Sequence, residues 1–339
     1  MPVASSNSIS FAFVALLRKR ALRFPVGFLL LLLFMEVGLR AALGLGNPIL
    51  YDADSAYGYF MRPNQHTRRL LARTNINSRG MRCPEFNSHK PSGTLRLMFL
   101  GDSITYGTTQ VDQQDIFVEL VRKNLSMDIH RPVEEINAST NGWAIENEYD
   151  FVSSRGTYNS DYVLMVLNSG DPTQPFSTLA EVQNAFTTAP GTAIEELSIR
   201  LFSRSRADAG TAVENAPEIE QRNLQLLTRV VKIVRTQGSE FVLIFVPIRR
   251  AIAQGAGHSV PQALKKWADA QNVRLFDLTD ALSMYETRSI TLHDGIHFNE
   301  RGNRLIADSL ERHFAALYFA KGASTEDGAN RTSAPEEHQ

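Results

Sequence analysis

The sequence has little cysteine and no excess of charge. Cys83 is the only cysteine among 339 residues, which excludes an intramolecular disulfide and a zinc or iron–sulfur site built on several thiolates. The 35 Lys and Arg residues nearly balance the 36 Asp and Glu residues, giving a formal net charge of −1. Because nucleic-acid binding draws on excess positive charge, we expect no nucleic-acid partner. We find no His, Asp and Glu cluster with metal-ligand spacing and no glycine-rich phosphate loop, so we expect no metal and no cofactor.

Hydrophobic residues make up 43% of the chain, enough for a packed core, but they are unevenly distributed. No charge occurs from Phe24 to Met35, and the apolar character resumes after Glu36 and continues to Leu45. A helix of about 20 residues rises about 30 Å, enough to cross the hydrocarbon core of a bilayer. Glu36 and Arg40 are spaced so that they can pair on one face of such a helix. We therefore predict a transmembrane helix over residues 24–45.

The charges around this segment predict its orientation. Four basic residues precede it, whereas residues 46–61 contain no Lys or Arg. By the positive-inside rule, residues 1–23 are cytoplasmic and the chain after the span is extracytoplasmic, in the periplasm if the cell is Gram-negative. Two alternatives remain open. One is a cleaved signal peptide, although no clean Ala-x-Ala site lies near residues 41–43; the other is a buried core helix.

After this segment, short apolar runs alternate with helical patterns. The runs are near-continuously apolar, which is typical of parallel strands covered on both faces. We predict an α/β fold with strands at residues 95–100, 133–137, 162–167, 241–246 and 273–278, and helices at 113–125, 218–236, 261–271 and 301–319. In such sheets the ligand crevice lies beyond the carboxyl ends of the strands.

The remaining segments define the organisation of the chain. Residues 46–94 have few apolar runs and predict a loop-rich connector that wraps the domain at 95–320. Residues 169–216 interrupt the alternation, with a helix expected at 193–202, and an insertion of this length is typical of a lid or substrate wall. The small, polar tail at 321–339 is expected to be disordered.

Two short motifs carry the chemistry. The first strand runs directly into Gly101-Asp102-Ser103-Ile104-Thr105, which places Ser103 at the start of a helix, where backbone N–H groups can point toward an oxyanion. A serine hydroxyl needs a base, and Asp294 and His297 lie three residues apart just before the last predicted helix. On a tight turn the carboxylate can hold one imidazole nitrogen while the other faces the serine. We therefore predict Ser103 as nucleophile, His297 as base and Asp294 as its partner.

These motifs give the sequence a resemblance to the SGNH/GDSL hydrolase family, from about Leu95 to Phe319. Residues 101–105 match its first block and Asp294-x-x-His297 its last, and Asn141-Gly142 resembles its second block. The resemblance implies a flavodoxin-like three-layer α/β/α sandwich and Ser-His-Asp esterase chemistry. It also implies an oxyanion hole formed by Ser103, Gly142 and Asn168.

The third block departs from the family pattern of Gly-x-Asn-Asp. The third predicted strand ends in Val166-Leu167-Asn168-Ser169, so Val166 replaces the glycine and Ser169 the aspartate. Upstream, residues 75–82 (Asn-Ile-Asn-Ser-Arg-Gly-Met-Arg) are similar to a segment that precedes the catalytic domain in membrane-anchored members linked to surface polysaccharides. A polar turn in the connector is the alternative interpretation of this segment.

Several further residues are candidates for substrate contact. Trp143 can stack on a sugar or lie in the core, and Arg249 and Arg250 can bind an acidic group or be solvated. His293 is expected to be a surface or supporting histidine. The predicted function is a serine esterase that acts on ester groups, O-acetyl in particular, of an envelope or exported carbohydrate. The alternatives are an O-acyltransferase with the same residues, and a catalytically silent carbohydrate-binding module.

Overall fold

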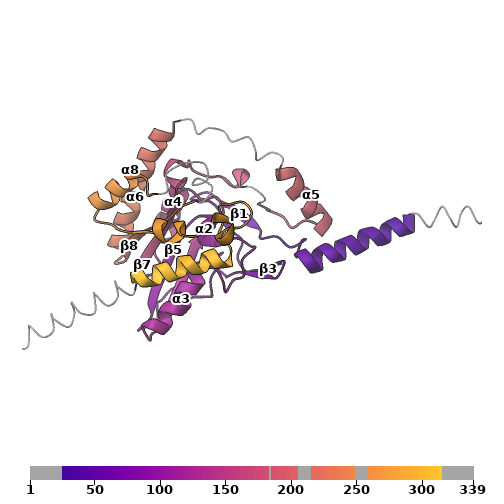
Figure 1. The fold of residues 1–339 in the computed structure, drawn as a ribbon, viewed down its shortest axis with the longest axis horizontal. Coiled ribbons are helices and arrows are strands. Elements are labelled where there is room, and N and C mark those ends of the chain that lie inside the picture. Colours follow the sequence, from indigo (N-terminus) through magenta and orange to yellow (C-terminus); the bar gives the residue numbers. More distant parts are fainter. Residues whose placement is uncertain (1–24, 183–184, 205–214, 249–258, 315–339) are drawn as a thin grey trace, which may run out of the picture.

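The computed structural model describes residues 25–182, 185–204, 215–248 and 259–314. A five-stranded sheet forms the centre of the main body (Figure 1). All its strand pairs are parallel, and the order corresponds to 2-1-3-4-5 along the chain, the order of flavodoxin-like folds. The predicted parallel α/β fold is confirmed, and the strands lie close to their predicted bounds: β6 (Val133–Ser139), β5 (Leu95–Gly101), β7 (Tyr162–Asn168), β8 (Glu240–Val246) and β9 (Arg274–Asp277).

Side chains of each strand alternate between two covered faces of the sheet. In β5, Leu97 and Phe99 pack on one face, and Met98 and Leu100 pack on the other. The first face is covered by α3 (Phe117–Asp128) and the helix at residues 300–314, and the second by α4 (Ile145–Arg155), α6 (Ala216–Thr236) and α8 (Gln262–Ala270). Burial on both faces explains why these strands are near-continuous apolar runs in the sequence.

The helix at residues 300–314 is the last described element and is joined to α3 by polar contacts (Figure 1). The backbone N–H of Phe117 donates to Asn303 Oδ1 at 2.9 Å, and Asn124 donates to Glu311 at 2.7 Å. Two short helices, α9 (Thr279–Ser283) and α10 (Thr287–Ile290), connect β9 to the loop that carries His297. The remainder of the predicted last helix, and the tail at 321–339, lie outside the described residues.

The connector contains two antiparallel hairpins that the sequence analysis did not predict. β1 (Tyr51–Asp54) pairs with β2 (Gly58–Met61), and β3 (Gln65–Arg69) pairs with β4 (Ala72–Ile76). Tyr59 and Phe60 of β2 are buried in the same core as α4. The hairpins therefore pack against the sheet domain and share its core.

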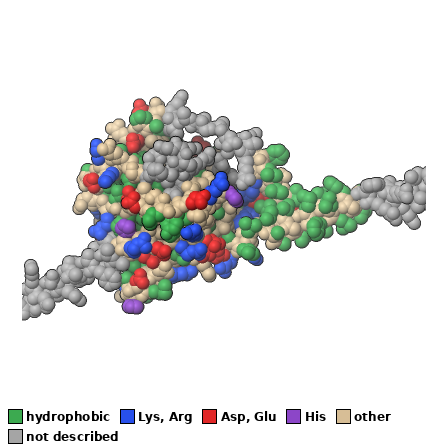
Figure 2. Space-filling model, viewed as in Figure 1, with side chains coloured by type: hydrophobic (Ala, Val, Ile, Leu, Met, Phe, Trp, Pro, Cys, Tyr) green, Lys and Arg blue, Asp and Glu red, His purple; other side chains and the backbone are tan. Residues whose placement is uncertain are grey.

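The N-terminal helix, Pro25–Leu43, has a mean hydropathy of 2.1, and none of its apolar window is buried. It projects from the main body with apolar side chains along its surface (Figure 2). This exposure contradicts the core-helix alternative. The predicted pair is confirmed, because Arg40 Nε donates to Glu36 Oε1 at 2.6 Å. The helix is long and apolar enough to span a membrane; residues 1–24 lie outside the described residues.

The insertion is divided between two places. Its first part forms two short 3-10 helices, η2 (Asp171–Thr173) and η3 (Leu179–Glu181), and Gln174 donates to the carbonyl of Gly142 at 3.0 Å. Its second part is α5 (Ala193–Arg204), which confirms the predicted helix and lies beside the end of the N-terminal helix (Figure 1).

Candidate active site

The register of the sheet brings three motif loops to one edge. Gly101, the last residue of β5, pairs with Ser139 of β6 on one side and with Val166 of β7 on the other. Within a few positions along the chain, Gly101 is followed by Ser103, Ser139 by Gly142 and Val166 by Asn168. Because parallel strands end at the same edge, the three loops of the sequence motifs meet there.

Ser103 is held at the start of a single helical turn. Asp102 precedes α2 (Ser103–Tyr106), and its carboxylate accepts the backbone N–H of Ile104 at 2.8 Å. The turn folds back tightly, since a Cβ on Gly101 would collide with the side chain of Thr105. The sharp turn directs the Ser103 side chain toward the loop before the last described helix.

A continuous chain of hydrogen bonds joins Ser103 to an imidazole and a carboxylate. His297 Nε2 lies 2.8 Å from Ser103 Oγ, and His297 Nδ1 lies 2.7 Å from Asp294 Oδ2. The side chains of His297 and Asp294 are 24% and 39% exposed, so the arrangement is open to solvent. The structure thus brings together the three residues that the sequence predicts as a triad.

Asp294 is fixed by the turn that it caps. Its Oδ1 accepts the backbone N–H groups of Ile296 at 2.9 Å and His297 at 3.0 Å, which leaves Oδ2 for the imidazole. Burial acts to raise the pKa of Asp294, but hydrogen bonds from the imidazole and from these two N–H groups outweigh it and lower the pKa to about 2. The carboxylate therefore stays ionised at neutral pH, as an imidazolium partner requires.

Two backbone N–H groups at the site are available to a ligand. Within the described part of the chain, the N–H of Ser103 and that of Gly142 donate to no acceptor. Gly142 has a φ of +77°, a conformation that favours glycine. The loop of Gly142 is also bonded to the β1–β2 hairpin, because the hydroxyl of Tyr59 donates to the carbonyl of Asn141 at 2.7 Å.

The side chain of Asn168 lies at the same edge but is already engaged. Its Nδ2 donates to Asp102 Oδ2 at 3.0 Å and to Asp171 Oδ1 at 2.7 Å, and its Oδ1 accepts the N–H of Gly170 at 2.7 Å. Asp171 also accepts the backbone N–H of Asn168 at 2.7 Å. Asp171 was not among the predicted site residues. The family pattern places an aspartate directly after the asparagine, whereas here the aspartate lies three residues on and is brought back by the bend that precedes η2.

Three buried carboxyl groups gather behind this asparagine. Burial is the main cause of their raised pKa values. The pKa of Asp102 rises to about 6, and the pKa values of Asp171 and Glu148 rise well above the usual range. The charge of Asp102 also raises the pKa of Asp171 and of Glu148, and the charge of Asp171 raises that of Glu148, because like charges disfavour ionisation. Glu148 belongs to α4 and is 1% exposed. The burial of Glu148 could not be recognised from the sequence, because a glutamate on a helix is usually exposed to solvent.

Comparison with family models identifies the family of the chain. The model described as the GDSL-like lipase/acylhydrolase family matches residues 99–305, more than half of the chain. The chain belongs to this family. It is therefore an ester-bond hydrolase, and the resemblance inferred from the sequence motifs is confirmed.

Among solved structures, the GDSL hydrolase matches a lipase/acylhydrolase from Enterococcus faecalis at 16% identity, covering 66% of this chain and 96% of that one, with a TM-score of 0.43. It matches a family 3 carbohydrate esterase from Clostridium thermocellum at 14% identity, covering 67% and 98%, with a TM-score of 0.41. It matches the esterase EstA from Pseudoalteromonas sp. at 14% identity, covering 66% and 98%, with a TM-score of 0.41. The search of curated proteins gives no match.

Of the predicted substrate contacts of this GDSL hydrolase, the structure describes Trp143 alone. Trp143 is fully buried, stacks on Phe60 with ring centroids 5.1 Å apart, and donates its indole N–H to the carbonyl of Tyr59. It has no free face for a sugar, so its assignment to substrate contact is wrong; the apolar β1–β2 hairpin covers it. His293 is exposed, as expected of a surface histidine. Arg249 and Arg250 lie outside the described residues.

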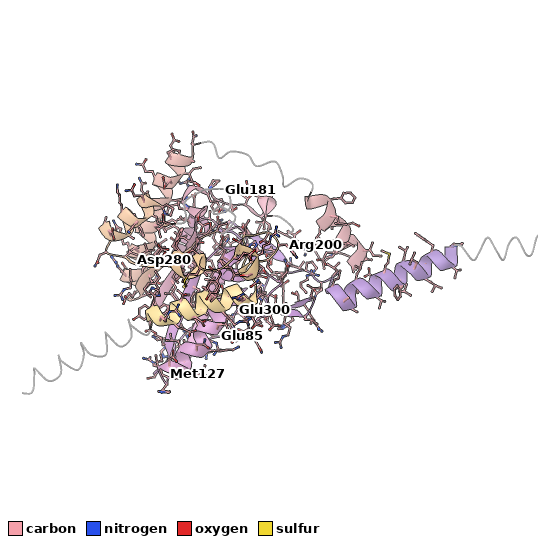
Figure 3. The ribbon with its side chains drawn as sticks, in the orientation of Figure 1. Glu85, Met127, Glu181, Arg200, Asp280 and Glu300 are labelled. Atoms are coloured by element: carbon pink, nitrogen blue, oxygen red, sulfur yellow. The ribbon has the colours of Figure 1, made fainter. Side chains whose placement is uncertain are left out.

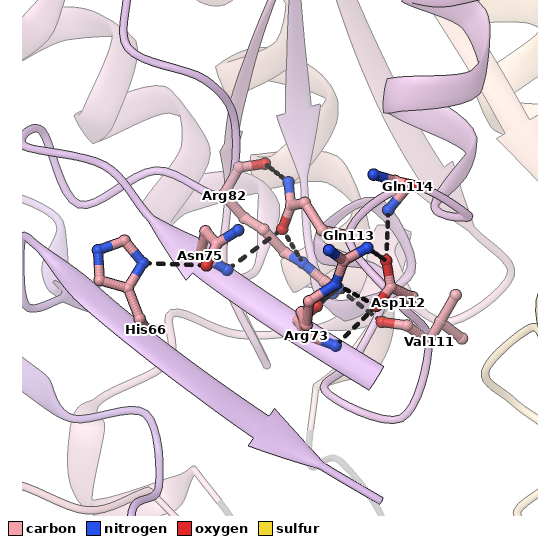
Figure 4. Close-up of polar contacts among 8 residues, drawn as sticks. All are labelled: His66, Arg73, Asn75, Arg82, Val111, Asp112, Gln113 and Gln114. Carbon is pink, nitrogen blue, oxygen red and sulfur yellow. Dashed lines mark hydrogen bonds and ion pairs between the residues drawn. The ribbon is translucent and has the colours of Figure 1, made fainter. Parts of the chain in front are cut away.

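The upstream segment that resembles membrane-anchored family members ends in a fully buried arginine (Figure 4). The guanidinium of Arg82 donates to the carbonyls of Tyr106 at 3.0 Å and Val111 at 2.7 Å, and also to the carbonyl of Thr108. It further donates to Gln113 Oε1 at 3.1 Å. These acceptors belong to the loop that continues from α2, so Arg82 fixes the chain directly after the helix of Ser103. The segment thus forms a turn at residues 77–80, as its alternative interpretation expects, and the arginine that follows this turn supports the loop after Ser103.

Proposed function

We propose that this GDSL hydrolase is a serine esterase that removes ester-linked acyl groups, O-acetyl in particular, from an envelope or exported carbohydrate. The observation that supports the proposal most is the chain of hydrogen bonds from Ser103 Oγ through His297 to Asp294, at 2.8 and 2.7 Å. Nucleophile, base and orienting carboxylate at these separations are the arrangement that serine hydrolases use.

In the proposed mechanism, Ser103 Oγ attacks the ester carbonyl while His297 Nε2 takes the hydroxyl proton. Asp294 stabilises the imidazolium that forms. The oxyanion accepts the N–H groups of Ser103 and Gly142, each donor worth about 3–4 kcal/mol in the transition state. Collapse of the intermediate releases the alcohol with the proton from His297 and leaves the acyl group on Ser103.

Asn168 is the third proposed oxyanion donor. Because both of its amide hydrogens are donated to carboxyl groups in the absence of substrate, it donates to an oxyanion only by sharing or exchanging one of these bonds. The bond to Asp102 is the longer of the two, at 3.0 Å compared with 2.7 Å, and is the one we expect to be exchanged.

Release of the acyl group distinguishes an esterase from an O-acyltransferase. The exposure of the His297 and Asp294 side chains favours water as the acceptor, since a transferase has to keep water away from its acyl-enzyme. We therefore propose that His297 deprotonates a water molecule, which attacks the acyl-Ser103 carbonyl. The acid is then freed as His297 returns this proton to Ser103 Oγ.

The N-terminal helix is proposed to be an uncleaved anchor that holds the domain outside the cytoplasm. Glu36 accepts the backbone N–H of Ala193, and the carbonyl of Leu43 accepts the N–H of Leu70, so both residues contribute bonds to the folded domain. Cleavage near residues 41–43 would remove Glu36 and break the first contact. The location and the similarity of residues 75–82 to polysaccharide-linked members support a carbohydrate substrate.

The proposal is tested by incubating the full-length protein in detergent with acetylated oligosaccharides and measuring released acetate. The Ser103→Ala and His297→Ala variants should lose release, whereas His293→Ala, a matched change at an exposed neighbouring histidine, should retain it. Adding an unacetylated oligosaccharide tests transfer. Acetylated acceptor without free acetate would favour the transferase, and no release above Ser103→Ala from any acetylated carbohydrate would contradict the proposed substrate.

A further inference from the structure

Helix α5 combines a buried charged residue with large exposed apolar residues, which is unusual for a surface helix. The side turned inward carries Glu196, which is fully buried and accepts bonds from Arg69 at 2.5 Å and Arg200 at 2.7 Å. Its other oxygen accepts the backbone N–H of Gly46 at 2.6 Å. The side turned outward carries Leu201 and Phe202, which are 57% and 76% exposed. A helix in contact with water normally exposes its charges and buries its apolar residues.

A second exposed apolar group lies at the tip of the β3–β4 hairpin. Leu70 and Leu71 are 52% and 80% exposed, although both are large aliphatic side chains. The backbone N–H of Leu70 donates to the carbonyl of Leu43, the last residue of the N-terminal helix, at 3.1 Å. This hydrogen bond ties the hairpin tip to the end of the helix.

Helix α5 is joined to the N-terminal helix at Glu36, about two turns before Leu43. The carboxylate of Glu36 accepts the backbone N–H groups of Ala193 at 2.8 Å and Ile194 at 3.1 Å, which are orphan donors at the start of α5. Figure 3 shows α5, marked by Arg200, beside the end of the N-terminal helix, with Met127 of α3 at a distant part of the body. In Figure 2 apolar side chains continue from the N-terminal helix onto the adjoining part of the body. The polar contacts therefore fix two exposed apolar groups around one end of an apolar helix.

We propose that these two groups form a membrane-contact surface that rests in the interface of the bilayer spanned by the N-terminal helix. The surface consists of Leu70, Leu71, Ile199, Leu201 and Phe202. The inference depends on the proposed anchor. A span of 19 residues is about 28 Å long, close to the thickness of the hydrocarbon core, so its end at Leu43 lies near the membrane surface.

The bilayer is favoured over a second copy of the chain by this connectivity. Leu70 is bonded to Leu43 and the start of α5 to Glu36, so both groups stay at the level of the last two turns of the helix, whatever else the protein binds. The exposed apolar residues of α5 have a physical reason at that level, because apolar side chains beside a membrane lose water by entering its interface. The catalytic domain then has two attachments to the membrane, the spanning helix and this surface, which restrict its rotation about the helix.

Site-directed spin labelling of the full-length chain in phosphatidylcholine–phosphatidylglycerol nanodiscs tests this inference. Cys83, the only native cysteine, is buried, so single labels are introduced by Leu71→Cys and Phe202→Cys. Met127→Cys and Met284→Cys are matched controls at exposed apolar positions, 64% and 76% exposed, and Leu31→Cys reports on the spanning helix. The readout is the accessibility of each label to oxygen, which enters lipid, compared with a water-soluble nickel chelate.

We expect the labels at positions 31, 71 and 202 to be accessible to oxygen and protected from the nickel chelate. The labels at 127 and 284 should be accessible to the nickel chelate and less accessible to oxygen. Nickel accessibility at 71 and 202 equal to that at 127, with position 31 protected, would overturn the membrane-contact surface and leave the anchor intact. Nickel accessibility at position 31 as well would overturn both. Protection from both reagents at 71 and 202, with dipolar broadening between labels, would show a second copy on this surface and overturn the proposal.

Discussion

Asp171 holds Asn168 with both oxygens of its carboxyl group, one accepting the backbone N–H and the other the side-chain amide, each at 2.7 Å. The family pattern has an aspartate directly after this asparagine, and the chain has Ser169 there instead. The bend at Ser169 and Gly170 brings Asp171 back to the asparagine, so a carboxyl group three residues away fixes its orientation.

Replacement of Asp171 should therefore impair catalysis through Asn168. In Asp171→Ala the amide loses its shorter bond and is held only by its bonds to Asp102 and Gly170, so it is positioned less firmly, and a misplacement of about 1 Å can cost about 100-fold in rate. We expect kcat for a nitrophenyl ester to fall about 10- to 100-fold with KM little changed. Ser169→Ala, at the position where the family has its aspartate, is the control and should keep most of the activity. Unchanged kcat in Asp171→Ala would contradict this role.

Asp294 is predicted to act through its charge and its orientation of His297. In Asp294→Asn the imidazole loses its ionised partner, and changes of this kind in serine hydrolases lower kcat by about 10⁴-fold. We expect a loss of about 10³- to 10⁴-fold in steady-state hydrolysis, without loss of folding by circular dichroism. Asp280→Asn, at an exposed site on α9, should have no such effect. A loss below tenfold in Asp294→Asn would argue against the proposed triad.

Arg82 is predicted to stabilise the loop after Ser103. A lysine has one compact ammonium and cannot reproduce the fork that reaches several carbonyls, so Arg82→Lys leaves buried acceptors without donors, at about 1–3 kcal/mol each. We expect the free energy of unfolding in urea to fall by about 2–4 kcal/mol, and kcat to fall with it. The matched change Arg73→Lys, at a more exposed arginine of the same network in Figure 4, should cost no more than about 1 kcal/mol. Equal effects of the two changes would contradict the assignment.

Glu148 gives a prediction for the pH dependence of stability. Burial raises its pKa in the folded state, so the folded protein keeps a proton that the unfolded chain loses above its ordinary pKa of about 4.3. Its contribution to stability is complete below that pH and is lost as the pH rises through the folded-state pKa, at up to about 1.4 kcal/mol per pH unit. Glu148→Gln has no proton to lose, so its stability relative to the wild type should increase from pH 4 toward pH 8.

Urea unfolding at several pH values measures this difference. Glu218→Gln, at an exposed position in the first turn of α6, is the control and should follow the wild type at each pH. A constant difference between Glu148→Gln and the wild type across the range would show that Glu148 is not protonated in the folded protein.

The sequence predicts the central sheet because its strands are buried on both faces and are therefore apolar throughout. It does not predict the β3–β4 hairpin, because three of the inward positions carry Thr67, Arg69 and Thr74 and only the rest carry apolar residues. It predicts helix α5 but not its orientation, because the inward side is held by Glu196 and its arginine partners. Patterns that assume apolar residues inside do not detect elements that are packed by charge.

The active site likewise contains residues that the sequence predicts and residues that it does not. The spacing of Asp294 and His297 and the position of Ser103 after a strand are local features, and they are sufficient to place three side chains together. The buried position of Trp143 depends on a hairpin more than 80 residues earlier, as its 84-residue separation from the Tyr59 carbonyl shows, and its neighbours in the sequence do not reveal it. Asp171 and Glu148 reach the site through a bend in the chain and a helix face, which no spacing rule of the motifs includes.

The central claim, that Ser103 is the nucleophile, is tested most directly by reaction with a fluorophosphonate followed by mass spectrometry of the peptides. The account predicts one adduct on Ser103 in the full-length protein, no adduct in Ser103→Ala, and strongly slowed labelling in His297→Ala but not in His293→Ala. An adduct on another residue, or labelling of the wild type no faster than that of Ser103→Ala, would contradict it.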